Sequence, residues 1–321
     1  MNQKDQKRQN QETILDLLQS QPAISQVDIS VQTGLQTSTV SYVVRTLKEL
    51  GIVHATGKGD SGPSGGKKAD LLALRPDYGT IGGIVVKNDG IISCITDFTG
   101  KIVDRQEIGT QGLADGAILK RIIATIEANS SSYSNYRGTG VAVTSVVGLS
   151  GDVMKSTYFG HSIPRFVAQL QTAYPELALV VENDANCAAY YDHVFRRPRF
   201  RNLVHLHVPT RPFTIGAGII IDNVLYRGAT GAAGEVLKEA RASRVETVLE
   251  RVILFVASLL DTEAIFITGE FDHAAAKRVR TMIETLAPST SCALELLEDP
   301  ETPILGASLQ AIREHLRQVL S

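Results

Sequence analysis

The sequence predicts a protein of mixed α/β class, in which an amino-terminal winged helix-turn-helix precedes a larger α/β body. Three apolar patterns of helical spacing, followed by two short apolar strands, lie within residues 1–78. From Thr80 onward, β-rich apolar runs alternate with helical segments, which indicates an α/β arrangement. The 321 residues suffice for two or three compact units.

Composition narrows the class of protein. Hydrophobic residues make up 43% and charged residues 21% of the chain, values typical of a globular protein. No apolar run reaches the roughly 20 residues of a membrane span, and the amino terminus MNQKDQKRQNQE has no apolar core like that of a secretory signal. We therefore expect a cytoplasmic protein that does not contact a membrane. Because the net charge is −2, any DNA binding must come from a local surface.

The spacing of cysteine and histidine does not predict a metal site. The three cysteines lie far apart without C-x-x-C spacing, so we expect buried thiols at Cys94, Cys187 and Cys292. His205 and His207 share one face of an expected strand. Two such ligands without a third nearby more often pack or hydrogen-bond locally.

Two helices are expected before Gly34. The second begins with Ser25, which is followed three residues later by Asp28, as in a capping box. Val27 and Val31 give this second helix its apolar spacing. The first helix has apolar residues at i, i+3 and i+4, namely Ile14, Leu17 and Leu18.

A third helix is expected to end at Gly51, with a buried stripe formed by Val40, Val43, Val44 and Leu47. Gln36 is a poor N-cap, so Thr37 is the expected cap and would shift the start of this helix. The face of this helix opposite the apolar stripe could be an ordinary solvated surface. Because the helix is the third of a compact three-helix unit, however, DNA binding is the favoured interpretation. The candidate DNA-binding residues on that face are Thr37, Ser38, Ser41, Tyr42 and Arg45.

A wing is expected after the third helix. Residues 52–55 and 71–74 read as two strands joined by the Gly- and Ser-rich segment GKGDSGPSGGKKAD. Lys67 and Lys68 make this segment locally positive, which suits contact with phosphates or the minor groove. A solvated linker is the alternative interpretation.

The body divides into two similar halves. The runs IGGIVV, GIISCITD and KIVDRQEIG precede a helical segment and the strand GTGVAVTSV, and a second such set begins at NLVHLHV. This duplication predicts an actin-like architecture. We expect the winged helix-turn-helix at residues 1–78, a first lobe at 79–196 joined by a carboxy-terminal helix at 305–321, and a second lobe at 197–304.

Several segments resemble one known family. The run TGLQTSTVSYVVRTLKELGIV, followed by SGGKKADLLALRPDYG, is similar to the amino-terminal part of repressors of the ROK (repressor, open reading frame, kinase) family. The segments VVENDANCAAY, IGAGIIIDNVLYRGATGAAGE, LLDTEAIFITGE and ILGASLQAI resemble, in the same order, the surroundings of the active cleft in ROK sugar kinases and repressors. The resemblance covers most of the chain.

The resemblance implies that phosphoryl transfer has been lost. The family's D-x-G-G-T turn corresponds to VVKND at residues 85–89, and its G-T-G-I-G loop to PTRPFTIG at residues 209–216. A third glycine-rich segment is reduced to Gly269-Glu270-Phe271. Such loops hold phosphates by close backbone approach. We therefore expect neither ATP nor another cofactor, and no enzymatic activity.

Part of the family's sugar site persists. Asp184 matches the catalytic base and Glu235 a carboxylate that hydrogen-bonds the sugar, whereas Lys238 stands where the family has a histidine. The resemblance implies a ligand in the cleft between the lobes that touches all three residues, and the cation favours a phosphorylated or acidic sugar. In the alternative, Lys238 turns to the surface or pairs with Glu235 and closes the pocket. Asn183, Asp184 and Asn186 would then only satisfy backbone groups at a turn.

Other family positions have changed. Thr144-Ser145 replaces a Pro-Gly pair, a sugar-binding asparagine is replaced near Tyr158, and the cysteine-rich zinc segment that would lie between Glu235 and Leu259 is absent from the sequence. The resemblance implies a transcriptional repressor that binds operator DNA as a homodimer or larger homo-oligomer, with an inactive kinase-like domain and a modified or lost site for a sugar effector. A sugar kinase with degenerate ATP loops and a ligand-independent DNA-binding protein are the alternatives.

Overall fold

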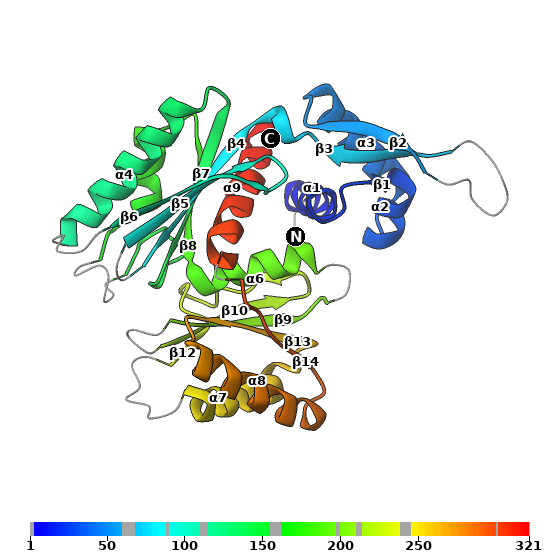
Figure 1. Cartoon of the computed structure of the whole chain (residues 1–321). Coiled ribbons are helices and arrows are strands. Elements are labelled where there is room, and N and C mark those ends of the chain that lie inside the picture. The colour runs from blue at the N-terminus through cyan, green and yellow to red at the C-terminus, as the bar shows by residue number, and fades with distance from the viewer. Residues whose placement is uncertain are drawn as a thin grey trace.

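The computed structural model of the chain (Figure 1) describes residues 3–59, 68–87, 90–109, 115–154, 162–196, 200–209, 214–237, 245–299 and 301–320. Three sheets organise these residues, one in the amino-terminal domain and one in each of two α/β lobes. The three cysteines are buried and free, as expected. Among the described helices, none combines the length and hydropathy that a membrane span requires.

The amino-terminal domain is a winged helix-turn-helix, which confirms the prediction. Its wing consists of two antiparallel strands, β2 (Val53–Lys58) and β3 (Asp70–Leu74). The short strand β1 (Ile24–Ser25) pairs with the other side of β3. The three helices are α1 (Gln3–Ser20), α2 (Gln26–Thr33) and α3 (Thr37–Glu49).

The second helix begins as expected but buries a different face. The Ser25 hydroxyl accepts a hydrogen bond from the backbone N–H of Asp28 (3.1 Å) and donates one to the Asp28 carboxylate (2.7 Å). The predicted apolar face was wrong, because Val27 and Val31 are 59% and 77% exposed while Ile29 is buried. In a helix of eight residues, tertiary packing of one side chain decides which face turns inward.

The start of α3 also differs from the prediction. Gln36 occupies the N-cap position without a side-chain capping bond, and Thr37 is the first helical residue, so Thr37 does not cap the helix. The Gln36 backbone is extended, and its carbonyl accepts the first helical hydrogen bond from Val40 N–H (3.1 Å). The predicted apolar stripe is buried, at Val40, Val43, Val44 and Leu47.

The first lobe is built on a five-stranded sheet with the order β6-β5-β4-β7-β8. Strands β4, β7 and β8 run parallel, and β5 and β6 extend the sheet antiparallel. Helix α9 (Thr302–Leu320) packs against β4, β7 and β8. The other elements are η1 (Pro76–Tyr78), β4 (Thr80–Val86), β5 (Gly90–Asp97), β6 (Ile102–Gly109), α4 (Asp115–Ser132), β7 (Tyr136–Val143), α5 (Phe166–Ala173) and β8 (Ala178–Asn183).

The second lobe repeats this strand order as β11-β10-β9-β13-β14, with β12 also paired to β10. The repeated order confirms the duplicated α/β body. Helix α6 (Asp184–Phe195) lies between the lobes and contacts α9, β9 and β10 (Figure 1). The elements of the lobe are β9 (Leu203–Val208), β10 (Ile215–Ile221), β11 (Val224–Leu225), β12 (Glu235–Leu237), α7 (Val245–Leu260), β13 (Ala264–Gly269), α8 (His273–Leu286), η2 (Ala287–Ser289) and β14 (Ala293–Leu296).

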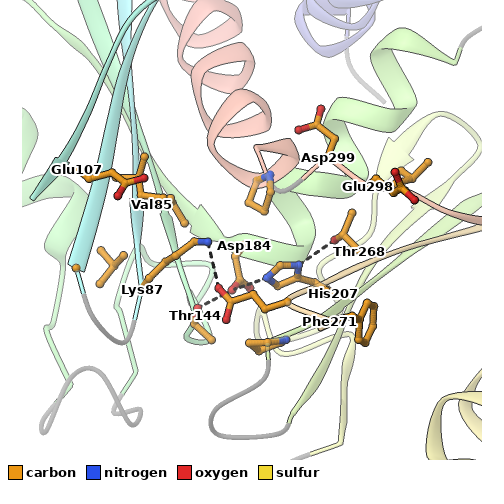
Figure 2. Close-up of a pocket in the computed structure, with 18 of the residues that line it drawn as sticks. Val85, Lys87, Glu107, Thr144, Asp184, His207, Thr268, Phe271, Glu298 and Asp299 are labelled. Atoms are coloured by element: carbon orange, nitrogen blue, oxygen red, sulfur yellow. Dashed lines mark hydrogen bonds and ion pairs between the residues drawn. The ribbon is translucent and has the colours of Figure 1, made fainter. Parts of the chain in front are cut away.

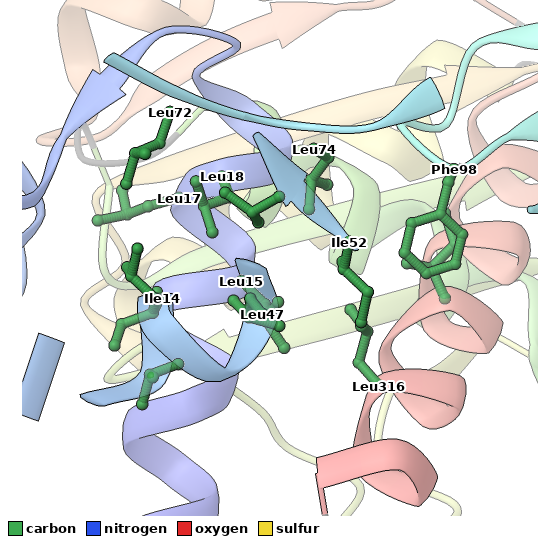
Figure 3. Packing of buried hydrophobic residues seen from close by; sticks show 14 of the residues in the cluster. Ile14, Leu15, Leu17, Leu18, Leu47, Ile52, Leu72, Leu74, Phe98 and Leu316 are labelled. Carbon is green, nitrogen blue, oxygen red and sulfur yellow. The ribbon is translucent and has the colours of Figure 1, made fainter. Parts of the chain in front are cut away.

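The winged helix-turn-helix and the first lobe share one hydrophobic core. Figure 3 shows side chains of α1 and α3, such as Leu15 and Leu47, in the same cluster as Phe98 and Leu316 of the lobe. Ile52, just before the wing, is completely buried there. Domains joined only by a linker reorient freely, whereas a shared apolar core holds them together. The winged helix-turn-helix is therefore fixed to the first lobe.

His315 of α9 makes this junction sensitive to acid. Its ring is buried beside Phe98, with Nε2 3.3 Å from the Tyr78 hydroxyl. Burial, with the charge of Arg137, lowers the pKa of His315 from 6.5 to about 4. The unfolded chain therefore binds the proton first, and the stabilisation present above pH 6.5 is lost as the pH falls toward 4.

We expect the free energy of unfolding to fall by about 2 kcal/mol more in the wild type than in His315→Gln between pH 7.5 and pH 5. Glutamine removes the titrating ring and retains hydrogen-bonding capacity. Urea unfolding of both proteins at the two pH values measures this difference. An equal loss in both proteins would show that His315 does not carry the acid sensitivity.

Candidate functional site

The exposed face of α3 is the candidate DNA-binding surface. All five predicted residues of this helix are exposed, because the buried stripe lies on the opposite face: Thr37, Ser38, Ser41, Tyr42 and Arg45. The Arg45 side chain is 68% exposed and lies 3.9 Å from the Glu49 carboxylate. Its guanidinium also lies 5.8 Å from the Tyr42 ring centre. These weak contacts leave the guanidinium able to exchange partners for a base edge or a phosphate.

A contact from α2 orients this face. The Ser41 hydroxyl donates a hydrogen bond to the side-chain carbonyl of Gln26 (2.9 Å), the first residue of α2. In the wing, Lys58 and Asp70 form an ion pair across the two strands, and Lys68 is exposed beside them. Lys67 lies outside the described residues, so the structure places only one of the two predicted wing lysines.

A cleft of about 1110 Å³ lies between the two lobes (Figure 2). Asp184, the first residue of α6, lies at its centre with its side chain 5% exposed. The Thr144 hydroxyl donates a hydrogen bond of 2.6 Å to the Asp184 carboxylate. His207 Nε2 lies 3.8 Å from the same carboxylate oxygen. Side chains of both lobes therefore meet at Asp184.

The two histidines of β9 form a hydrogen-bonded row rather than a metal site. His207 Nδ1 lies 3.0 Å and His205 Nε2 2.7 Å from the hydroxyl of Thr268, and His205 Nδ1 lies 2.6 Å from the Asp192 carboxylate. Burial lowers the pKa of His207, although the charge of Asp184 opposes this shift. Within the described ranges, no three His, Cys, Asp or Glu side chains are placed to hold a metal ion.

Two ion pairs near Asp184 connect the lobes. Lys87, just after β4, lies 3.1 Å from the Glu270 carboxylate, which follows β13. Glu182 in β8 accepts a bond of 2.6 Å from Arg227 Nε of the second lobe. The Glu182 side chain is only 5% exposed, so its carboxylate is largely desolvated, whereas the Arg227 side chain is 39% exposed. Neither pair was predicted from the sequence.

The predicted ligand-binding residues are not all brought together. Asp184 lines the cleft, whereas Glu235 lies half-buried in β12 and is not among the lining residues. Lys238 and Tyr158 lie outside the described residues. Asn183 caps α6 by accepting bonds from the N–H groups of the next turn (2.9 and 3.2 Å), so its role in a turn is the interpretation that its contacts support.

The described parts of the segments that correspond to the family's phosphate loops carry side chains in place of glycine. Lys87 occupies the first loop, and Glu270 and Phe271 occupy the third. A Cβ at Gly269 would collide with the Phe271 ring, so this ring covers the remaining glycine. Among the described residues that line the cleft, five carboxylates outnumber one lysine, Lys87: they are Glu107, Asp184, Glu270, Glu298 and Asp299. Negative lining of this kind repels a polyphosphate.

These features define a two-lobed, actin-like α/β body fused to a winged helix-turn-helix. Residues 81–236 match the ROK family, and residues 7–54 match the winged helix-turn-helix DNA-binding family. The chain therefore carries a ROK family domain after an amino-terminal winged helix-turn-helix.

Known proteins resemble the chain in sequence or in fold. The xylose repressor of Bacillus subtilis (strain 168) is 29% identical over 235 residues, which are 72% of this chain and 60% of the relative. The chain thus spans about 60% of the length of that relative. A crystal structure of a ROK family transcriptional regulator, a homologue of the E. coli MLC protein, has a TM-score of 0.73 at 16% identity and covers 98% of this chain and 99% of its own. A ROK family glucokinase from Streptomyces griseus, in complex with glucose and AMPPNP, has a TM-score of 0.59 at 16% identity and covers 72% of this chain and 99% of its own.

Proposed function

We propose that the protein is a DNA-binding transcriptional repressor that holds operator DNA with α3 and the wing. The observation that carries this proposal is the exposed row of hydroxyl, aromatic and guanidinium groups on α3, opposite a buried apolar stripe. Side chains on the exposed face of a recognition helix reach base edges in the major groove. The resemblance to xylose repressors at 26% and 29% identity supports the same function.

Two copies are needed for a specific operator. One recognition helix contacts only a few base pairs, and helix-turn-helix proteins gain specificity by pairing two half-sites about one helical turn, or a multiple of it, apart. The repressor therefore acts as a homodimer or a larger even oligomer on a two-fold symmetric site. Selection from a random duplex library with the full-length protein tests this, because a dimer enriches a palindrome. Enrichment of no sequence would refute the proposal.

The cleft binds an effector and does not catalyse phosphoryl transfer. Positioning and charge stabilisation supply nearly all the catalysis in phosphoryl transfer, and the glycines that would cradle phosphates are replaced. The pair between Lys87 and Glu270 bridges the lobes in that region. Asp184 retains the position of a base, but among the described residues that line the cleft the one lysine, Lys87, is already paired with Glu270.

The sensor's ligand is a neutral sugar. Carboxylates accept hydrogen bonds from sugar hydroxyls, as Asp184 accepts one from Thr144. The negative lining disfavours the phosphorylated or acidic sugar that Lys238 led us to expect, and Lys238 itself lies outside the described residues. Xylose is the first candidate, because the relatives are xylose repressors.

We expect calorimetry to detect xylose binding that is lost in Asp184→Asn, and to detect no binding of glucose 6-phosphate or ATP. Asp272→Asn is the matched control, because Asp272 caps α8 outside the cleft lining and asparagine caps equally well. ADP release with xylose or glucose should stay at the level of a boiled sample. Sugar-dependent ADP release that Asp184→Asn abolishes would establish the kinase alternative.

A further inference from the structure

Helix α1 of the DNA-binding domain carries two carboxylates that are buried against the body. Glu12 is 8% and Asp16 4% exposed. The Tyr190 hydroxyl of α6 donates a hydrogen bond of 3.1 Å to Asp16, and Glu12 accepts bonds from Arg317 Nε (2.6 Å) and from Arg313, both on α9. We call these five residues the α1 seam. Breaking a buried charged contact is strongly unfavourable, so the seam fastens α1 to both helices.

Helix α6 joins the seam to the cleft and to both lobes. Its first residue is Asp184, at the centre of the cleft, and its second turn carries Tyr190 of the seam. A Cβ at Gly218 of β10 would overlap the carbonyl of Ala185, so α6 lies directly against the second lobe. A Cβ at Gly306 of α9 would likewise overlap a carbonyl of α6. Closely packed contacts of this kind move as units and do not deform gradually.

Among the described residues, the second lobe meets the DNA-binding domain across a groove and not through a shared apolar core. A polar groove of about 730 Å³ separates them, lined by α1 and the end of α2 on one side and by Arg201 and the β10–β11 turn on the other. Within the described residues, the contacts between elements that fix α1 to the body come from α6 and α9. The apolar cluster that contains the α1 side chains includes no described residue of the second lobe, so α6 is the packed element that joins α1 to that lobe.

We propose that α6 transmits the state of the cleft to the DNA-binding domain through the α1 seam. A change in the spacing of the lobes moves α6 relative to β10 or α9, and α1 follows because Asp16 and Glu12 are fastened to those helices. The inference rests on the proposed function, since it supplies the route by which a cleft ligand would control DNA binding.

Hydrogen–deuterium exchange of the full-length protein, without DNA, tests this route. Glu270→Gln removes the carboxylate that pairs with Lys87 across the cleft. We expect it to change the exchange rate of amides at residues 12–18 by about fivefold, the low end of measured allosteric coupling. Tyr190→Phe removes only the hydroxyl bonded to Asp16, and in that background the response to Glu270→Gln should fall below twofold.

Two further variants keep the test decisive. Tyr174→Phe is the matched control, because its hydroxyl bonds to Glu127 (3.0 Å) within the first lobe, and the fivefold response should persist in its background. If Tyr190→Phe does not fold, Arg317→Gln breaks the seam at its partly exposed end. An unchanged response in the seam variants, or no response of α1 to Glu270→Gln, would overturn the proposal. This measurement is made without DNA, so it tests the route through α6 separately from DNA binding. If the exchange at α1 responds to Glu270→Gln but the protein binds no DNA, only the proposed function is refuted.

Discussion

Arg45→Ala should weaken binding to the selected operator by about 30-fold or more, which corresponds to at least about 2 kcal/mol. A guanidinium that reads a base contributes about 1–3 kcal/mol of discrimination, and a two-fold complex contains two such guanidinium groups. Arg45 has the position for this role, because it lies on the exposed face of α3 and makes only weak contacts with Glu49 and Tyr42.

Fluorescence anisotropy titrations at several salt concentrations distinguish the two ways in which Arg45 could bind. If it reads a base, preference relaxes at one position of each half-site; if it binds phosphate, affinity falls evenly and the salt slope decreases by about one for each phosphate that is no longer neutralised. Arg121→Ala is the matched control, since Arg121 is exposed on α4, far from α3 (Figure 1). Unchanged affinity for Arg45→Ala would contradict the assignment of the Arg45 face of α3 as the DNA-binding surface.

Gly306→Ala should destabilise the protein by about 3 kcal/mol. Alanine favours a helix over glycine by about 1 kcal/mol, so an ordinary position in α9 would gain stability from this change. At Gly306 the added Cβ would overlap the carbonyl oxygen of Cys187 in α6. Two backbones must then separate, and overpacking of this kind costs about 1–3 kcal/mol or more.

Urea unfolding at pH 7.5 measures this loss. Gly57→Ala provides the control, because a Cβ at that wing position meets nothing within 4 Å, and its stability should change little. If Gly306→Ala were as stable as the wild type, α6 and α9 would not be in backbone contact. The proposed transmission through α6 would then lose one of its two packed surfaces.

The sequence could predict elements whose signal is local. The stripe of α3 was predicted because four apolar side chains recur at helical spacing, and the repeated runs of the body predicted two similar lobes. The same reasoning failed at Val27 and Val31, because a short helix offers two plausible faces and the surrounding core selects one. Local pattern therefore predicts the type of element better than the face that it buries.

Contacts between residues that are far apart in the sequence leave no local pattern from which they could be predicted. Glu182 and Arg227 are 45 positions apart, and Lys87 and Glu270 are 183 apart. Charged residues of this kind are usually solvated, and only the folded arrangement of the two lobes brings each pair together. The burial of Asp16 was equally unpredictable, because its position on α1 is that of an ordinary exposed residue until α6 packs against it.

The most direct test of the account is the ratio of the dissociation constants of the full-length protein for its selected duplex and for a scrambled duplex of the same length, at 150 mM salt. Specific regulators bind their sites about 10³-fold or more tightly than unrelated DNA. We predict a ratio of that size, reduced by xylose. A ratio near one, with or without the sugar, would contradict the central claim that this protein is a sequence-specific DNA-binding regulator.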